Sequence, residues 1–216
     1  MAEKKRPRRT RERILEVSLA LFNRLGAPNV TTGDIAGEMN ISPGNLYYHF
    51  SNKDEIVLEL YLRYEARVQP LYASRGDRRI DVDDLWLWLH LLFEAMGEYR
   101  FLYRDLHELT TRDPKLGRRF AMLLRQAIVT VIQLCDGLAE AGSLSGSQRE
   151  IEALAQNAVL VATYWSSYDR VLSATRDKNE EEPDAGRAAY QVMALFAPYL
   201  TGEARAYLDR LSAEYL

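Results

Sequence analysis

The sequence predicts an all-α protein, with a small three-helix module at the N-terminus and a larger helical domain after it. Apolar residues recur at steps of three and four over long segments, whereas the alternation and hairpin turns of β-strands are hard to find. Most of the seven prolines and twelve glycines fall between those segments. The 216 residues, 47% of them apolar, suffice for one domain or for a small module attached to a larger one.

The charges divide unevenly along the chain. Of the 28 basic and 31 acidic side chains, residues 1–56 carry nine and seven, so this segment has a net charge of +2 and the remainder has −5. Seven of the nine basic residues precede Ile14. This pattern predicts a flexible basic arm over residues 1–9 on a mildly acidic protein.

Three features predict a cytoplasmic protein with no membrane partner. Cys135 is the single cysteine, so no disulfide forms within the chain, which suits a reducing compartment. The charged N-terminal segment is not followed by the apolar run of a secretory signal. The longest nearly unbroken apolar stretch, residues 85–93, has about half of the ~18 residues that a membrane span needs.

The first two helices are predicted from their end signals. The first covers about 10–25 and stops at Gly26, because glycine adopts the left-handed conformation at a helix end at little cost. The second begins after a cap by Thr31 or Thr32, whose side chains can accept hydrogen bonds from the open amides, and it ends near Asn40.

A third short helix follows at once. Ser42 caps it, and Pro43 occupies the first helical position, where the missing N–H costs nothing. Leu46 and Phe50 are four residues apart and are predicted to be its buried pair. The outward face then consists of Gly44, Asn45, Tyr47, Tyr48 and His49.

Two short helices joined by a tight turn form a helix-turn-helix, a motif that lays its second helix in the major groove of DNA. Exposed aromatics beside an Asn and a His are poor choices for a solvated surface, but they suit phosphates, base edges and thymine methyl groups. The alternative is that Tyr47 and Tyr48 pack against a fourth helix, predicted from Lys53 to about Ala73.

The rest of the chain is predicted to be helical as well. A helix that starts at Asp81 is apolar almost all round from Leu85 to Phe93, so it is expected to be buried on most sides. Breaks at Pro and Gly residues separate the further helices, at about 99–110, 115–141, 148–174, 187–199 and from 202 onward.

The run TTGDIAGEMNISPGNLYYHFSNKDEIV, residues 31–57, resembles the DNA-binding signature of TetR-type regulators. The resemblance implies a homodimer whose larger domain binds a small-molecule effector and whose DNA-binding module then releases double-stranded DNA. It also implies an operator that is an inverted repeat. The expected organisation is a basic arm at 1–9, a helix-turn-helix DNA-binding domain at 10–56, and an effector-binding and dimerisation domain at 57–216.

The resemblance also assigns roles within the module. It implies that phosphates are met mainly by Thr32, Tyr48, His49 and Lys53, and that the floor of the groove is met by Gly44, Asn45 and Tyr47. Gly33 stands where some relatives carry a base-reading Arg, and Ser42 and Pro43 belong to the same interface. The dimer is expected through two C-terminal helices, by way of Ala155, Ala158, Ala162, Ala189, Val192, Met193 and Phe196.

Aromatic residues concentrated in the second domain suggest an apolar effector pocket, since Tyr, Trp and His add a hydrogen-bonding tip to an apolar wall. The candidate residues are Trp86, His90, Phe93, Phe101, Tyr103, His107, Tyr164, Trp165 and Tyr168. Residues 85–106 and 168–172 loosely resemble PhaD-type regulators of polyhydroxyalkanoate storage, which implies a fatty-acid or acyl-coenzyme A effector. The cation for such a carboxylate or thioester would come from Arg100, Arg104 or Arg125.

Other classes of function are less consistent with these residues. An enzyme needs a convergent nucleophile and base, whereas the three histidines lie in unrelated contexts, and no catalytic residue or cofactor is expected. A metal sensor would use His90, Glu94, His107 and Cys135, but their spacing is not diagnostic and no metal site is predicted. A protein of the same fold that acts as an activator, or that has lost DNA binding, is the remaining alternative.

Overall fold

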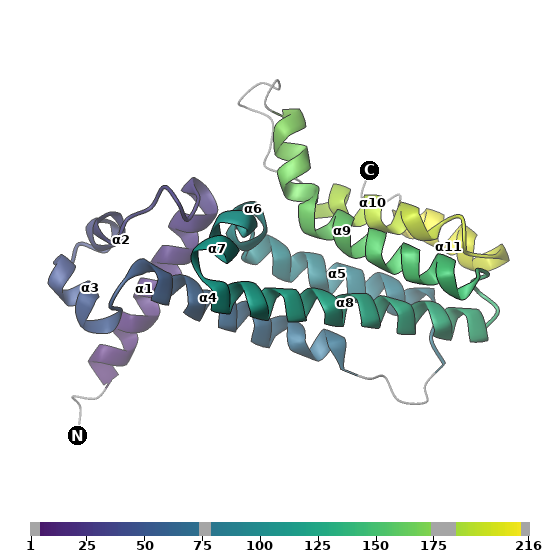
Figure 1. Ribbon diagram of the computed structural model, residues 1–216, viewed down its shortest axis with the longest axis horizontal. Coiled ribbons are helices and arrows are strands. Elements are labelled where there is room, and N and C mark those ends of the chain that lie inside the picture. The colour runs from purple at the N-terminus through teal and green to yellow at the C-terminus, as the bar shows by residue number, and fades with distance from the viewer. Residues whose placement is uncertain (1–4, 74–78, 174–184, 213–216) are drawn as a thin grey trace. The chain divides into compact units, whose positions relative to one another are not determined.

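The computed structural model describes residues 5–73, 79–173 and 185–212 (Figure 1). Within these ranges the regular structure is helical and includes no strand, which confirms the predicted all-α fold. The elements are α1 (Lys5–Leu25), α2 (Thr32–Glu38), α3 (Pro43–His49), α4 (Lys53–Val68), the 3₁₀ helix η1 (Gln69–Tyr72), α5 (Val82–Glu98), α6 (Phe101–Arg104), α7 (Leu106–Arg112), α8 (Pro114–Glu140), α9 (Gln148–Ser173), α10 (Ala185–Phe196) and α11 (Gly202–Ser212).

The first helix starts earlier than predicted. Residues 5–9 of the expected flexible arm belong to α1, and residues 1–4 lie outside the described residues. Pro7 does not prevent this start, because it falls in the first turn, where an N–H has no intrahelical acceptor. Part of the basic segment is therefore a helical extension of the DNA-binding module.

The fourth helix ends earlier than predicted. It was expected to reach Ala73, but α4 stops at Val68 and residues 69–72 form the 3₁₀ helix η1. Pro70 explains the change, because its ring clashes with the preceding turn and it has no N–H to donate.

The chain forms two compact units. The first consists of Met1–Arg67 with Tyr99–Phe120, and the second of Val68–Glu98 with Ala121–Leu216. This division differs from the expected domain boundary between residues 56 and 57. It differs because α6, α7 and the start of α8 pack in the first unit, where the Phe101 ring lies 5.3 Å from that of Phe22.

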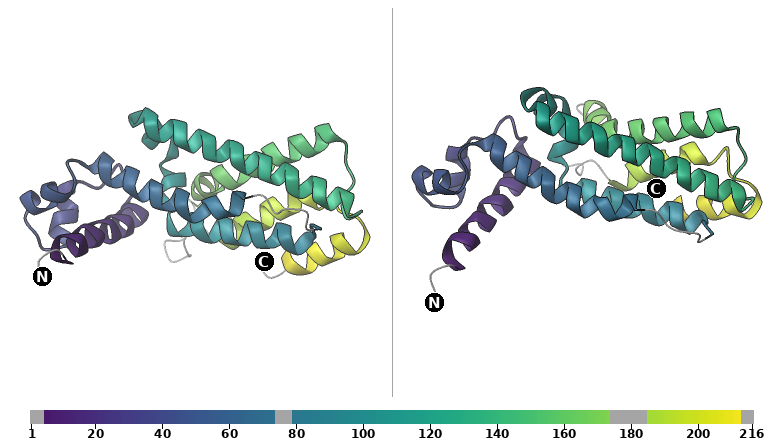
Figure 2. Two further views of the ribbon diagram at one scale, coloured as in Figure 1. Left: turned by 90° about the horizontal axis from the view of Figure 1, so that it is seen from below. Right: turned by 60° about the horizontal axis from the view of Figure 1, so that its bottom comes forward.

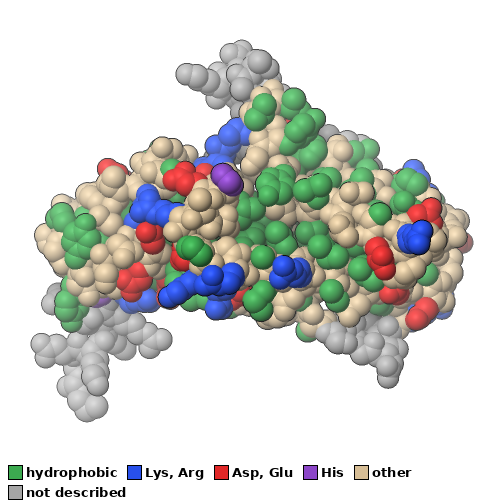
Figure 3. All heavy atoms as spheres, in the orientation of Figure 1, with side chains coloured by type: hydrophobic (Ala, Val, Ile, Leu, Met, Phe, Trp, Pro, Cys, Tyr) green, Lys and Arg blue, Asp and Glu red, His purple; other side chains and the backbone are tan. Residues whose placement is uncertain are grey.

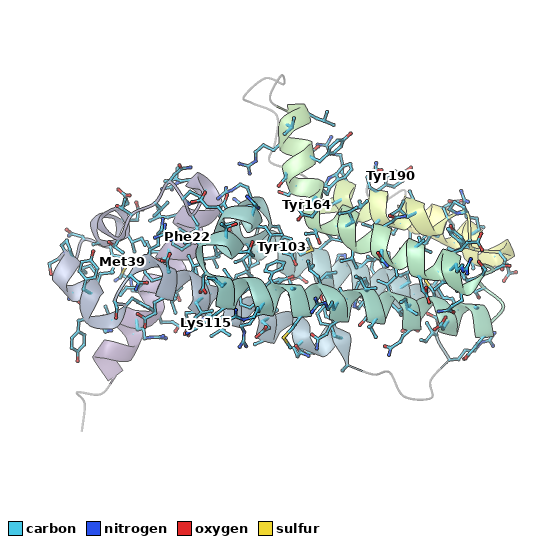
Figure 4. All side chains as sticks on the ribbon, in the orientation of Figure 1. Phe22, Met39, Tyr103, Lys115, Tyr164 and Tyr190 are labelled. Carbon is cyan, nitrogen blue, oxygen red and sulfur yellow. The ribbon has the colours of Figure 1, made fainter. Side chains whose placement is uncertain are left out.

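Aromatic rings from α4, α6 and α8 extend the core of the first unit. The hydroxyl groups of Tyr64 and Tyr103 are hydrogen-bonded to each other, and the Tyr103 ring lies 5.4 Å from Phe120. Figure 4 labels Tyr103 on α6 and Phe22 on α1. Phe101 and Tyr103, two residues suggested for the effector pocket, are thus core residues of the unit that carries the helix-turn-helix.

In the second unit, α10 packs against both α9 and α5, and α11 packs against α5 and α10 (Figure 2). The residues expected at a dimer interface are instead buried inside the chain, so that prediction is wrong for most of them. Small side chains let α9 and α10 of one chain approach closely. Six of the seven residues are at most 2% exposed, namely Ala155, Ala158, Ala189, Val192, Met193 and Phe196.

The apolar helix at residues 82–98 is less enclosed than predicted. Trp88, Leu89 and Phe93 are buried, but Leu87 and Leu91, four residues apart, share an exposed face of α5. The prediction was wrong about burial on most sides because an apolar composition does not show how many neighbours a helix has.

Among the described helices, α8 alone is both long enough and apolar enough to match a membrane span. An 18-residue window of α8 has a mean hydropathy of 1.4, and 39% of that window is buried, so by length and composition alone it matches a membrane span. A core helix of a soluble protein meets the same criterion, so this match is weak evidence. Arg125 and Gln126 interrupt the apolar residues of α8, so the sequence contains no long unbroken apolar run there.

The turn between α2 and α3 gives the first testable prediction. Asn40 has a φ of 54°, a left-handed conformation that side chains with a Cβ adopt at a cost of about 1–2 kcal/mol and that Asn tolerates better than most. We expect Asn40→Ala to lower the free energy of unfolding by about 1 kcal/mol in urea titrations, and Asn40→Gly to preserve or raise it. An equal loss in both variants would show that the Asn side chain, not the backbone conformation, matters.

Candidate nucleic-acid interface

Side-chain caps fix where α2 and α3 begin. The Thr31 side chain accepts a hydrogen bond from the Asp34 N–H at 3.1 Å, and the Asp34 carboxylate accepts one from the Thr31 N–H at 2.7 Å. Hydrogen bonds from Thr31 hold the pKa of the Asp34 carboxyl below its usual value. Ser42 accepts the Asn45 N–H at 3.3 Å, with Pro43 at the first helical position. The structure confirms the cap by Ser42 and the place of Pro43, and of the two predicted candidates Thr31 and Thr32 it is Thr31 that caps α2.

The outward face of α3 is as exposed as the sequence predicts. Leu46 and Phe50 are buried, while Tyr47 and Tyr48 are 51% and 79% exposed. The alternative, in which the two tyrosines pack against α4, is therefore wrong. Gly33, Gly44 and Asn45 are exposed on the same module, and Thr32 and His49 are partly exposed.

Two of the expected DNA contacts are joined before any DNA binds. The Tyr47 hydroxyl and Thr32 Oγ1 lie 3.0 Å apart and share a hydrogen bond, so a residue at the start of α2 helps to hold the orientation of a ring on α3. The rings of Tyr48 and His49 meet edge to face, 5.1 Å apart. The exposed rings are thus partly preorganised by neighbours within the module.

Lys53 has a structural role that the sequence analysis missed. Its ammonium group donates hydrogen bonds to the backbone carbonyls of Ala27, at 2.6 Å, and Val30, at 2.9 Å, and so ties the start of α4 to the turn between α1 and α2. Burial, and then the nearby charge of Arg112, lower the pKa of this ammonium. An ammonium has three N–H donors, so two of them are used inside the protein.

Two residues at the end of α6, Arg104 and Asp105, hold the same turn. The Asp105 carboxylate accepts the Ala27 N–H at 2.8 Å and pairs with the Arg104 guanidinium at 2.9 Å. Arg104 also donates to the backbone carbonyls of Phe22 and Asn23 at the end of α1. The Arg104 and Asp105 side chains are 8% and 10% exposed. Arg104 is therefore a buried structural residue rather than a cation for an effector, and no motif in the sequence signals this contact.

The nine residues suggested for effector binding are divided between the two units. Phe101, Tyr103 and His107 belong to the first unit, and the other six belong to the second. In the second unit, Trp86 stacks on His90 with ring centroids 5.1 Å apart, Trp165 lies 5.6 Å from Tyr168, and Phe93 is buried. Tyr164 and Tyr168 are exposed on α9.

The described part of the chain contains no cluster of side chains that would bind a metal ion. No group of three or more His, Cys, Asp and Glu side chains there is close enough to hold an ion. Burial raises the pKa of the Cys135 thiol to about 12, so this sulfur stays protonated at neutral pH and is a poor metal ligand.

A helical protein with a capped helix-turn-helix and an exposed recognition helix has the architecture of a DNA-binding transcriptional regulator. Comparison with family models agrees: residues 14–60 match "Bacterial regulatory proteins, tetR family" and residues 63–208 match "Bacterial transcriptional repressor". The chain belongs to the TetR family of transcriptional regulators. Regulators of this family bind operator DNA as dimers and respond to ligands.

Individual relatives support the assignment. A TetR-family transcriptional regulator from Marinobacter aquaeolei VT8 is 34% identical with a TM-score of 0.83, over 95% of this chain and 98% of that one. The regulator AcrR of Shigella flexneri is 31% identical over 68 residues, 32% of each chain. IcaR, a negative regulator of the biofilm operon of Staphylococcus epidermidis, is 37% identical over 97 residues, 44% of this chain and 52% of its own. These two alignments thus span about a third and about half of the curated relatives.

The contacts of Lys53 lead to a prediction that separates its two roles. We expect Lys53→Ala to lower the free energy of unfolding by about 1–3 kcal/mol, because the Ala27 and Val30 carbonyls lose a charged donor. Calorimetry measures this without DNA. We also expect weaker binding to all DNA sequences alike, with a salt slope smaller by ~1. Lys115→Ala, which removes an exposed lysine outside the helix-turn-helix, is the control and should leave stability unchanged. If Lys53→Ala were as stable as the original protein, the structural role of Lys53 would be refuted and only the phosphate contact would remain.

Proposed function

We propose that this protein is a dimeric repressor that acts in the cytoplasm, binds an inverted-repeat operator, and releases it when an apolar or amphipathic small molecule occupies the second unit. The exposed face of α3 carries this proposal. Two neighbouring tyrosines, an asparagine and a partly exposed histidine on one short helix form a surface with donors, acceptors and apolar area in positions that suit a duplex.

The contacts divide into two kinds. Thr32, Tyr48, His49 and Lys53 lie around the ends of α2, α3 and α4, and we assign them to phosphates, which fix the position of the protein on the duplex. Gly44, Asn45 and Tyr47 lie on the exposed face of α3 and are assigned to base edges, while Ser42 and Pro43 set the start of that helix.

Gly33 provides no side chain at the position where some relatives carry an Arg that contacts a base. A Cβ there would lie 3.4 Å from Thr31 Oγ1, which is an ordinary contact, so lack of space does not explain the glycine. Base reading in this protein therefore depends more on Asn45 and Tyr47 than in relatives with an Arg at the corresponding position.

The basic start of α1 adds attraction for the phosphate backbone. Arg9 and Arg13 are exposed. Arg11 is committed inside the module, because it pairs with Glu59 at 3.1 Å and lies over the Phe50 ring at 4.7 Å. Exposed cations that contact phosphates steepen the salt dependence of binding without adding sequence preference.

An apolar stripe on α9 is the surface that we assign to the dimer. Leu160, Tyr164 and Tyr168 recur at steps of four along one face and are each more than half exposed, and Val171 continues the stripe. Figure 3 shows hydrophobic side chains gathered along α8 and α9 on the face in view, and in Figure 1 the last turns of α9 stand out from the other helices of the unit. A two-fold dimer would present two copies of α3 to half-sites one helical turn of DNA, or a multiple, apart.

Binding to DNA can be tested directly. In a fluorescence titration with a duplex from the promoter of its own or an adjacent gene, the protein should bind saturably and lose affinity steeply as salt is raised. A scrambled duplex of the same length is the control. The absence of such binding to any inverted repeat would contradict the proposal.

Asn45 provides the sharpest test of base reading. An Asn side chain can form two hydrogen bonds with adenine, so Asn45→Ala should reduce discrimination at one defined position by about 1–3 kcal/mol. Selection from a randomised operator measures this position by position, and Lys115→Ala is again a control outside the helix-turn-helix. An unchanged sequence profile for Asn45→Ala would refute the assignment.

The dimer assignment also gives a prediction. Leu160→Glu places a charge within the apolar stripe of α9 and should convert the dimer to monomers and weaken operator binding at least tenfold, because two linked modules bind more tightly than one. Sedimentation measures the mass. The matched control is Leu87→Glu, the same change at an exposed leucine on α5, and it should remain dimeric. A dimeric Leu160→Glu would exclude this face.

A further inference from the structure

All three tryptophans of the chain carry a buried indole N–H that has no hydrogen-bond acceptor among the described residues. They are Trp86, Trp88 and Trp165, and all three lie in the second unit. A buried donor without a partner costs about 1–3 kcal/mol, and folded proteins rarely leave one unpaired. Three such donors in the unit to which we assign the effector suggest that an acceptor for at least one of them belongs to another molecule.

Trp88 is the most deeply placed of the three. It is 2% exposed, and its ring meets the Tyr72 ring of η1 edge to face at 6.4 Å. Burial strongly raises the pKa of the Tyr72 hydroxyl, so this phenol stays neutral and lies in a poorly hydrated environment. The two neighbouring rings thus carry an indole N–H donor and a hydroxyl group.

The charges of the second unit argue against an anionic ligand at this place. The charged side chains buried there, within the described ranges, are Asp84 and Asp169, and neither is a cation. Asp84 lies one helical turn before Trp88 on α5, on the same face. A ligand carboxylate at the Trp88 N–H would therefore lie near the Asp84 carboxyl group, and the described part of the second unit buries no cation to offset its charge.

The arginines suggested for a carboxylate effector do not change this conclusion. Arg100 and Arg104 belong to the first unit, and Arg104 is paired with Asp105. Arg125 is exposed on α8. Arg187 pairs with Asp169 at 3.1 Å in the second unit.

We propose that the Trp88 indole N–H donates a hydrogen bond to an uncharged oxygen, such as that of a ketone or ester, in an apolar effector, with the Tyr72 ring beside the same group. This inference rests on the proposed function, in which the second unit binds the effector. It differs from the fatty-acid or acyl-coenzyme A effector that the sequence resemblance implies.

Three ten-carbon probes separate the ligand classes: 2-decanone is neutral, decanoate is anionic and decylamine is cationic. Titrated into the full chain and followed by thermal shift, 2-decanone should stabilise the protein at concentrations at least tenfold lower than the other two. Trp88→Phe keeps a ring but removes the N–H, and it should weaken 2-decanone binding about tenfold. Lys115→Ala, a change at an exposed residue of the first unit, is the control and should bind 2-decanone like the original protein.

A spectroscopic measurement keeps the test independent of any variant. The infrared carbonyl band of bound 2-decanone should lie at lower frequency than in hexane, because a hydrogen bond weakens the C=O bond. Each of the following results would overturn the proposal: an unshifted band, decanoate binding as tightly as the ketone, undiminished binding in Trp88→Phe, or no saturable binding of 2-decanone. Release of operator DNA by decanoate would leave the proposed function intact while refuting the neutral ligand. Failure of the protein to bind any operator would refute the proposed function itself.

Discussion

The position of the recognition helix depends on how the turn between α1 and α2 is held. Ala27 is the centre of that turn: its carbonyl accepts the Lys53 ammonium and its N–H donates to the Asp105 carboxylate. Hydrogen bonds with a charged partner contribute about 1.5–3 kcal/mol each, more than a neutral pair. The chain leaves this turn directly into α2, and α2 packs against α3, so the contacts of one alanine backbone help to set the orientation of Asn45, Tyr47 and Tyr48.

The exposed tyrosines on α3 risk unspecific association, and contacts within the module restrict the motion of their rings. A surface of aromatic rings favours association with whatever apolar surface it meets. The hydrogen bond between Tyr47 and Thr32 restricts one ring before binding, and the edge-to-face contact between Tyr48 and His49 restricts the other. Less side-chain entropy then remains to be lost when the helix meets a duplex, which favours tight binding by a seven-residue helix.

Features set by neighbouring residues could be predicted from the sequence, and features set by distant residues could not. The caps by Thr31 and Ser42, the buried pair Leu46 and Phe50, and the helix ends near Gly26 follow from local chemistry, and the structure agrees. The second role of Lys53 depends on carbonyls more than twenty residues away, and the role of Arg104 on residues about eighty away. The same reason explains why the wrong face of α9 and α10 was predicted to meet a partner chain, because a stripe of small residues fits a partner chain or a neighbouring helix equally well.

The segment that includes Arg104 and Asp105 is connected by the backbone to the second unit on both sides. The chain passes between the two units at residues 67–68, 98–99 and 120–121. Two of these crossings bracket the segment that includes Arg104 and Asp105, and this segment joins α5, which carries Trp88, to α8. A ligand alters DNA affinity only by binding two states of the protein differently. A displacement of α5 or α8 in one of those states acts through continuous backbone on the two residues that hold the end of α1 and the Ala27 turn. Because the Arg104 and Asp105 side chains are only 8% and 10% exposed and are paired, such a displacement would break charged hydrogen bonds, so the turn is expected to respond as a switch between two arrangements rather than by gradual bending.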